Sequence, residues 1–210
     1  MKVAIRFALV IVVAAALAGC AEAPTGEVQV AKDALSAAEQ ANAGVYAAEE
    51  LKAASVAVAA AEAEISAQGE KFALTRKYDK ASSLIKEATE KAEKAKTVAI
   101  EAEMAARSEA ETILASTGES IQAVEATLVE LSGCEKTPKG FETDLAALNG
   151  SLEALKAELT TLESAIGDED YIGASARGKS LAGQVELMLA DLTSAQEKTG
   201  CVATASSDAV

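Results

Sequence analysis

The chain of 210 residues contains no histidine and no tryptophan, and aromatic residues make up only 3% of it. Without histidine, the commonest general acid or base and a common metal ligand are missing. Proline is also scarce, and Pro138 is the single proline after residue 25. Long stretches can therefore be helical without a break. Because no arrangement of a nucleophile beside a base is visible either, we predict a protein that is not an enzyme, with no catalytic residue, no metal site and no cofactor.

Alanine is what the chain has in abundance. Residues classed as hydrophobic make up 50% of the sequence, and alanine is the largest part of them. Alanine is the strongest helix former, but its side chain fills little volume in a core. This composition predicts helices that pack closely through small side chains.

The first 20 residues have the arrangement of an exported precursor. Lys2 and Arg6 precede or border an apolar run from Phe7 to Leu17, and small residues follow it. A charged segment, a short apolar segment and small residues before a cleavage point are typical of a signal peptide. The run is too short to cross a bilayer of roughly 30 Å as a helix. We therefore predict a signal peptide at residues 1–19.

The stretch Leu17-Ala18-Gly19-Cys20 resembles the lipobox of bacterial lipoproteins at every position. The resemblance implies that Cys20 is lipidated, carries palmitate or similar acyl chains, and becomes the mature N-terminus. Ala21 is not the aspartate that resembles an inner-membrane retention signal. The expected location is thus the cell envelope, anchored in the outer membrane and facing the periplasm. An ordinary secretory signal with an incidental cysteine is the alternative.

The mature chain would be strongly acidic. The whole chain has a formal net charge of −14, and removal of Lys2 and Arg6 with the signal leaves 17 basic against 33 acidic residues, a net charge of −16. Such a surface repels nucleic acid and anionic headgroups. We therefore expect no nucleic-acid partner, and a membrane attachment that depends on the acyl chains of Cys20 rather than on a basic patch.

Apolar residues recur at alternating steps of three and four along most of the remaining chain, which predicts five helices. After a tether at residues 20–26, with Thr25 as N-cap, the first helix runs to Gly44. The second begins at Tyr46 and ends between Gly69 and Lys77. The third runs from Tyr78 to residue 132. All three tyrosines are expected at helix starts, where a ring can close the end of an alanine-lined seam.

The third predicted helix carries a heptad seam that changes register. Its stripe consists of Tyr78, Ala81, Ile85, Ala88, Ala92, Ala95, Ala99, Ala102 and Ala106. Between Ala106 and Ile121 the steps become irregular and Gly118 intervenes, which predicts a stutter and a bend. Val124, Leu128 and Leu131 resume the stripe before Gly133 ends the helix.

Residues 133–140 form the clearest connector, and two further helices follow it. The fourth carries the strongest core pattern, Phe141, Leu145, Leu148, Leu152, Leu155, Leu159, Leu162 and Ile166. Gly167 is expected to end it and Asp168 to cap the fifth, whose stripe is Tyr171, Ala174, Gly178, Leu181, Val185, Met188, Leu192 and Ala195. Short connectors favour antiparallel neighbours. The fold class is therefore all-α: elongated antiparallel hairpins in a coiled-coil-like bundle with one long central helix.

This pattern predicts a helical hairpin module at residues 27–132, a connector at 133–140, a second hairpin at 141–198 and a disordered tail at 199–210. Within the first module, Tyr46-Ala47-Ala48-Glu49-Glu50-Leu51 and Tyr78-Asp79-Lys80-Ala81 are similar to the two helix starts of an uncharacterised domain-of-unknown-function family of alanine-rich envelope lipoproteins. Ala48 stands where that family usually has proline. Some members carry a peptidoglycan-binding domain downstream.

Cys134 and Cys201 remain once Cys20 is lipidated, and an exported protein reaches an oxidising compartment. Each lies just outside a predicted helix end, so a hairpin of the last two helices would bring them together. We predict a structural disulfide between them. Free thiols or a redox pair are the alternatives.

Two motifs suggest sites that the surrounding sequence argues against. The letters from Gly173 to Ser180 match a phosphate-binding P-loop, but Asp168, Glu169 and Asp170 precede them and no buried strand does. The heptad stripe also runs through Ala174 and Gly178. Gly173 and Gly178 are therefore expected to be close helix contacts, and no bound nucleotide is expected. The three acidic residues lack the spacing of a calcium loop and are expected to favour a helix start.

The function expected from these features is that of a non-catalytic membrane-anchored lipoprotein, a helical structural or protein-interaction module of the envelope. Its partner would be an envelope protein or a second copy of the chain, since heptad stripes on five helices need not all be buried within one molecule. The alternative is a carrier or chaperone-like module that binds an apolar ligand or an unfolded client between its helices.

Overall fold

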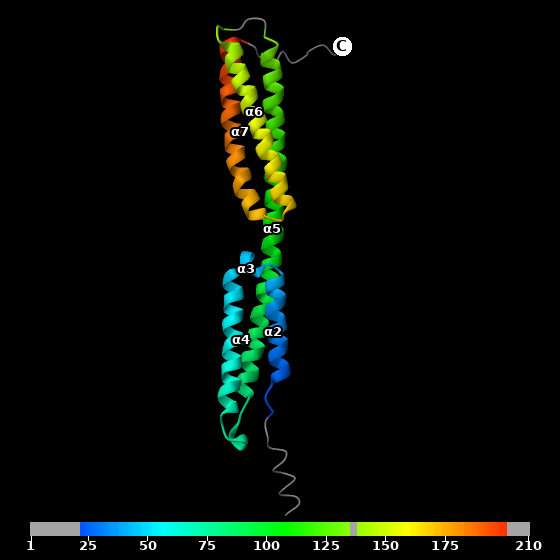
Figure 1. The fold of residues 1–210 in the computed structure, drawn as a ribbon, viewed down its shortest axis with the longest axis vertical. Coiled ribbons are helices and arrows are strands. Elements are labelled where there is room, and N and C mark those ends of the chain that lie inside the picture. Colours follow the sequence, from blue (N-terminus) through cyan, green and yellow to red (C-terminus); the bar gives the residue numbers. More distant parts are fainter. Residues whose placement is uncertain (1–21, 135–137, 201–210) are drawn as a thin grey trace, which may run out of the picture. The chain divides into compact units, whose positions relative to one another are not determined.

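The computed structural model describes residues 22–134 and 138–200. In these ranges the regular elements are six α-helices and one 3₁₀ turn (Figure 1). The elements are α2 (Thr25–Gln40), α3 (Ala43–Tyr46), α4 (Ala48–Gly69), η1 (Ala73–Thr75), α5 (Asp79–Ser132), α6 (Phe141–Gly167) and α7 (Tyr171–Thr199). The predicted all-α class with one long helix is confirmed.

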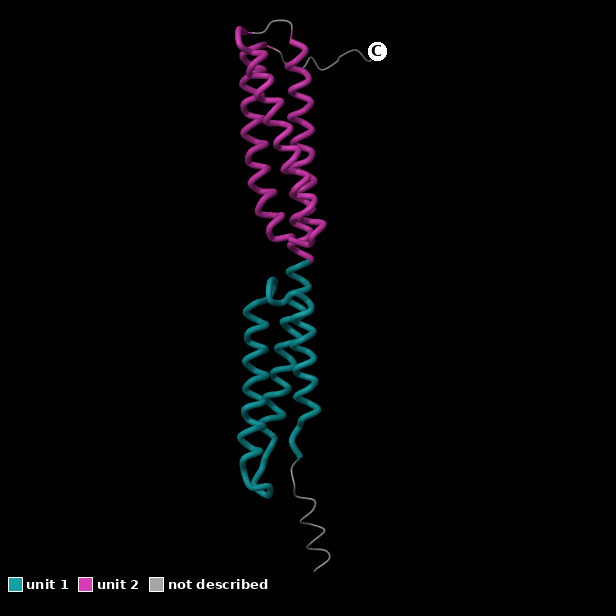
Figure 2. The backbone as a smooth tube through the Cα atoms, in the orientation of Figure 1, with its two compact units in different colours: residues 1–103 teal, residues 104–210 magenta. Residues whose placement is uncertain are grey.

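The chain divides into two compact units between Glu103 and Met104, and α5 contributes residues to both (Figure 2). The division differs from the predicted one, which followed the connector at 133–140. The reason is that Ile121, Val124 and Leu128 of α5 share one core with leucines of α6 and α7. The second half of α5 thus belongs with the second hairpin.

Unit 1 is a three-helix arrangement of α2, α4 and the first part of α5, with α3 at the turn between α2 and α4. Its two core clusters consist mainly of alanine: Ala31, Ala57, Ala61 and Ala88 in one, and Ala38, Ala43, Ala47, Ala95 and Ala99 in the other. Along α5, Ala81, Ala88, Ala92, Ala95 and Ala99 are fully buried at 0% exposure. The predicted seam of this helix is confirmed as far as Ala99, whereas Ala102 and Ala106 at its end are only half-buried. Its small side chains allow neighbouring helices to approach closely.

Unit 2 has a core of larger side chains from the second part of α5 and from α6 and α7. Its buried members are Ile121, Val124, Leu128, Leu131, Leu152, Leu155, Leu181, Val185, Met188 and Leu192. Phe141, Leu145 and Leu148 pack against them while partly buried. Both predicted stripes of the last two helices are therefore confirmed as core-facing.

The helix boundaries in unit 1 differ from the predicted ones at two points. Asn42 adopts the left-handed conformation with φ of 57° and follows the end of α2, whereas Gly44 lies inside α3. Asparagine tolerates this conformation better than most residues, so it supplies the stop expected of Gly44. Tyr46 consequently ends α3 rather than opening α4. Thr25 is the first residue of α2, and Pro24 at the N-cap position makes no side-chain cap.

The other predicted helix ends agree with the structure more closely. Tyr78 directly precedes α5 and Tyr171 is the first residue of α7, and both rings are buried, at 9% and 6% exposure. Through Gly118, where a bend was predicted, α5 continues as one helix to Ser132, next to Gly133, and the bend itself stays a prediction. Of the residues around the predicted stutter, Ala110, Thr117 and Ile121 are buried.

Candidate functional site

The predicted lipidation site and the predicted tail need to be placed first. The predicted signal peptide at 1–19, Cys20 and residues 201–210 of the predicted tail lie outside the described residues. The tail was predicted to begin at residue 199, but Thr199 is the last residue of α7. Cys134 is a disulfide-bonded cysteine and lies just after α5. It is the one cysteine among the described residues, so the assignment of Cys201 as its partner stays a prediction.

The P-loop-like letters from Gly173 to Ser180 lie entirely within α7, so no loop is present whose backbone N–H groups could cradle a phosphate. A Cβ added at Gly178 would lie 2.5 Å from Ile113 Cγ2 and 3.2 Å from Leu162 Cδ2. This confirms Gly178 as a close helix contact. Gly173 has another role than predicted: its missing Cβ leaves room for the carboxylate of Asp170.

The acidic run before α7 is a helix cap. Asp170 Oδ1 accepts a hydrogen bond from the backbone N–H of Gly173 at 3.0 Å, which makes Asp170 the N-cap instead of the predicted Asp168. Asp168 lies one step after α6, and Glu169 between them has φ of 63°. Within the two described ranges, no group of three or more histidine, cysteine, aspartate or glutamate residues could hold a metal ion.

A groove lies between α6 and α7 of unit 2, near the connector. It encloses about 540 Å³. Phe141, Leu145 and Leu148 line one side, and Asp191 and Lys198 are among the residues on the other. The three apolar side chains also pack on the core of the unit, so the groove is shallow and mixed in polarity.

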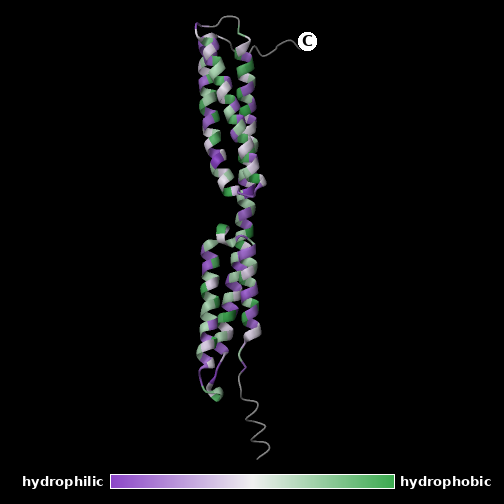
Figure 3. Ribbon diagram, viewed as in Figure 1, coloured by the Kyte–Doolittle hydropathy of each residue, from purple (hydrophilic) through white to green (hydrophobic). Residues whose placement is uncertain are grey.

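The most distinctive surface of unit 1 is the connection between α4 and α5, residues 70–78, which we call the tip loop. Phe72 and Leu74 are 71% and 64% exposed. Figure 3 shows the hydrophobic residues of η1 beside hydrophilic loop residues. Four basic residues, Lys71, Arg76, Lys77 and Lys80, lie in the interval 70–80 against two acidic ones, although the whole chain has a net charge of −14.

Hydrogen bonds hold the tip loop in one conformation. The Arg76 guanidinium donates to the carbonyl of Gly69 at 2.8 Å and to that of Lys71 at 3.0 Å, so it caps the end of α4. Thr75 Oγ1 donates to the carbonyl of Phe72 at 2.8 Å and closes the turn around η1. Phe72 and Leu74 are therefore displayed by an ordered backbone instead of being buried under it.

A second network joins the base of the tip loop to α4 and α5. Lys80 Nζ lies 2.6 Å from Glu64 Oε2, Gln68 donates to Glu64 Oε1 at 2.8 Å, and the backbone N–H of Lys77 donates to Gln68 Oε1 at 3.2 Å. The Glu64 side chain is only 13% exposed. The hydrogen bond from Lys80, and then that from Gln68, lowers the pKa of Glu64 below its ordinary value.

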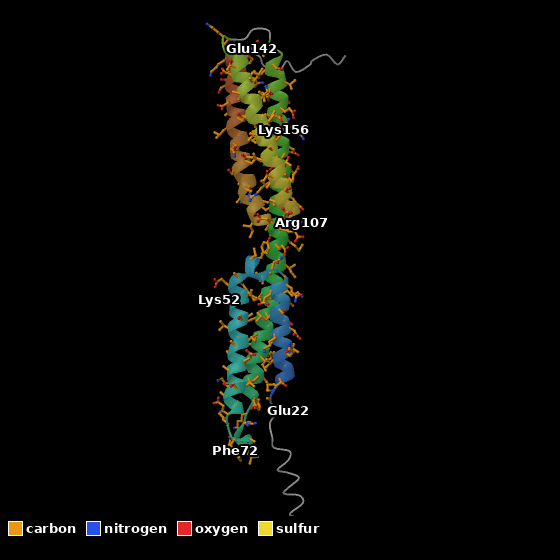
Figure 4. The ribbon with its side chains drawn as sticks, viewed as in Figure 1. Glu22, Lys52, Phe72, Arg107, Glu142 and Lys156 are labelled. Carbon is orange, nitrogen blue, oxygen red and sulfur yellow. The ribbon has the colours of Figure 1, made fainter. Side chains whose placement is uncertain are left out.

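The tip loop lies at the same end of unit 1 as the start of α2. Thr25 and Val28 line one groove with Ile65 and Ser66, which lie in the last two turns of α4. Lys32 of α2 pairs with Glu62 of α4 at 2.5 Å. Figure 4 shows Glu22 and Phe72 at this end of the unit. The start of the described chain and the exposed apolar side chains of the tip loop thus lie at the same end of unit 1.

The sequence already contained the signal for the tip loop, since Phe72 and Leu74 stand among basic residues in an acidic chain. The three-four pattern predicted only that a helix ends between Gly69 and Lys77. What it could not provide was the exposure of both side chains, which depends on how α4, η1 and α5 are joined.

The comparisons with known proteins add no relative: no family model, no curated protein and no solved structure matches the chain. Among the helices of residues 22–134 and 138–200, none is both long enough and apolar enough to cross a membrane.

Proposed function

We propose that this chain is a non-catalytic, lipid-anchored helical module of the bacterial cell envelope, held in the membrane by acyl chains on Cys20. The observation that carries the proposal is the complete lipobox Leu17-Ala18-Gly19-Cys20. The place of Cys20 in the chain also supports the proposal, because Thr25, the first residue of α2, follows it by only five residues. A segment of that length reaches at most roughly 18 Å, so the first helical unit would be held next to the bilayer.

The packing of the two units supports an interaction or spacing role. In each unit the apolar stripes are used up in forming a filled core, of alanine in unit 1 and of leucine in unit 2. Such bodies keep their shape and offer their outer faces to a partner. The partner would be an envelope protein or a second copy of this chain, and the expected location is the periplasmic face of the outer membrane.

The test is to express the full chain in a bacterium that processes lipoproteins and to label it with palmitate. We expect label on the parent protein, none on Cys20→Ser, and release of Cys20→Ser from salt-washed membranes. Ala23→Ser is the control, because it changes a residue of the tether and leaves both the lipobox and the other two cysteines intact. A parent protein that is exported and processed but takes up no palmitate, or a Cys20→Ser protein that still does, would refute the proposal.

The groove between α6 and α7 favours one alternative, a carrier for an apolar ligand or an unfolded client. Phe141, Leu145 and Leu148 would supply its apolar wall. Binding of an apolar dye to the purified lipoprotein, lost in Leu148→Asp, would support this alternative. If the chain is instead a structural or interaction module, we expect no dye binding by unit 2, since these side chains already pack on the core.

A further inference from the structure

We infer that the tip loop is a second membrane contact, in which Phe72 and Leu74 enter the same leaflet that holds the acyl chains of Cys20. The inference rests on the proposed function, because the anchor brings this end of unit 1 to the bilayer. The occupant of the surface is a phospholipid bilayer with anionic headgroups.

Exposure is the first argument. A phenylalanine and a leucine at 71% and 64% exposure leave much of their apolar surface in water. They lie two residues apart, next to and within a 3₁₀ turn whose backbone is tied by Thr75 and Arg76. Apolar side chains on an ordered projection can enter the boundary between headgroups and acyl chains without refolding of the protein.

Charge is the second argument. Lys71 and Lys77 are exposed residues of the same loop, and Lys80, which pairs with Glu64, is exposed in the first turn of α5. Basic residues that flank exposed apolar residues match an anionic lipid surface, and their attraction falls off within a Debye length, about 8 Å at physiological ionic strength. The acidic surface of the rest of the chain would keep the other faces away from the same lipids.

Position is the third argument. Glu22, two positions after Cys20, is at the same end of unit 1 as Phe72 (Figure 4). Thr25 lines a groove with Ser66, one turn before the end of α4. A lipid on Cys20 and an inserted tip loop would therefore hold unit 1 at two points and fix its orientation against the bilayer. Our expectation that the acyl chains alone make the attachment would then be incomplete.

The absence of tryptophan makes a direct test possible. Full-length lipidated Phe72→Trp protein is reconstituted into vesicles of phosphatidylethanolamine and phosphatidylglycerol, with or without bromine on the acyl chains near the headgroup. The matched control is Val56→Trp, at a site of α4 that is 63% exposed in the same unit. We expect emission of Phe72→Trp to shift to shorter wavelength and to be quenched by the bromine, and emission of Val56→Trp to do neither.

A charge variant tests the basic residues. In the Phe72→Trp background, Lys71→Gln with Lys77→Gln is expected to reduce the quenching, because no side-chain hydrogen bond or ion pair of the loop depends on these two lysines. High salt is expected to act in the same direction. Quenching that is unchanged by both would overturn the role of the basic residues.

Mass spectrometry of the same sample separates the two proposals. If Cys20 carries no acyl chain, the proposed function fails. If Cys20 is acylated and the vesicles hold the protein, but Phe72→Trp emits as Val56→Trp does, the inference fails and the proposed function stands. Capture of an envelope protein by a photocrosslinker at position 72, with no quenching in vesicles, would replace the lipid by a protein partner.

Discussion

At the scale of single residues, the smallest side chains decide most of what this fold can do. Gly178 is buried between α5 and α6, and any Cβ there would press on Ile113. In unit 1, fully buried alanines along α5 likewise leave room for neighbouring helices to pack closely. A position that looks like a phosphate-loop glycine is thus a packing glycine, because its space is occupied by neighbouring side chains.

Gly178→Ala is expected to destabilise the protein. Relief of the glycine helix penalty contributes about 1 kcal/mol, but overpacking costs about 1–3 kcal/mol, so the net loss should be up to about 2 kcal/mol. Urea unfolding followed by circular dichroism measures it. Gly183→Ala on the same helix is the control: nothing lies within 4 Å of its added Cβ, so it should stabilise by up to about 1 kcal/mol. Equal stabilisation by both changes would contradict the close contact.

Glu64 is expected to contribute stability that acid removes. Its folded-state pKa lies below the ordinary value, mainly because of the hydrogen bond from Lys80. The contribution is therefore present above the unfolded-state pKa of about 4.3 and is lost as the pH falls through the lower folded value. Carboxyl NMR titration should find the Glu64 pKa raised toward normal in Lys80→Gln. A pKa that is the same in Lys80→Gln and in the parent would contradict this assignment.

At the scale of elements, α5 is the helix on which both units are built. Its first part offers an alanine seam to α2 and α4, whereas Ile121, Val124, Leu128 and Leu131 offer larger side chains to α6 and α7. The predicted stutter falls between these two kinds of seam. One helix can therefore serve two differently packed partners because its buried side chains change size along its length.

The cap of α7 is the clearest local stabilisation of an element. Asp170→Ala removes the acceptor for the Gly173 N–H and should lower the free energy of unfolding by about 1 kcal/mol, whereas Asp170→Asn should retain most of the stability. Chemical denaturation of both variants measures the difference. Asp168→Ala is the comparison, and a larger loss there than at Asp170 would argue against Asp170 as the cap.

At the scale of the whole molecule, the charge is acidic overall but is locally reversed at residues 70–80, the tip loop and the start of α5, where four basic residues stand against two acidic ones. This reversal lies at the end of unit 1 where α2 begins, which is also the end nearest Cys20 along the chain. The combination of an acidic body with a basic apolar tip is what a protein held at an anionic bilayer by one end requires.

A disulfide between Cys134 and Cys201 would link the end of α5 to the end of α7, across 67 positions. Reduction is then expected to destabilise the protein by up to about 4 kcal/mol in the chain-entropy account. Cys201→Ser should have the same effect without reductant. Peptide mapping under non-reducing conditions identifies the partner, and a Cys134 peptide joined to anything other than Cys201 would refute the pairing.

The all-α class, the core stripes and most helix ends follow from the amino-acid pattern alone, because three-four periodicity and helix-stopping residues act locally. The stripes of α6 and α7 are buried where the leucines predicted it, and Gly133 follows the end of α5. Tertiary structure decided the rest. It assigned part of α5 to each unit, made Asn42 the boundary residue after α2, and left Phe72 and Leu74 exposed. These outcomes depend on which side chains meet across helices, which the spacing of residues along the chain does not encode.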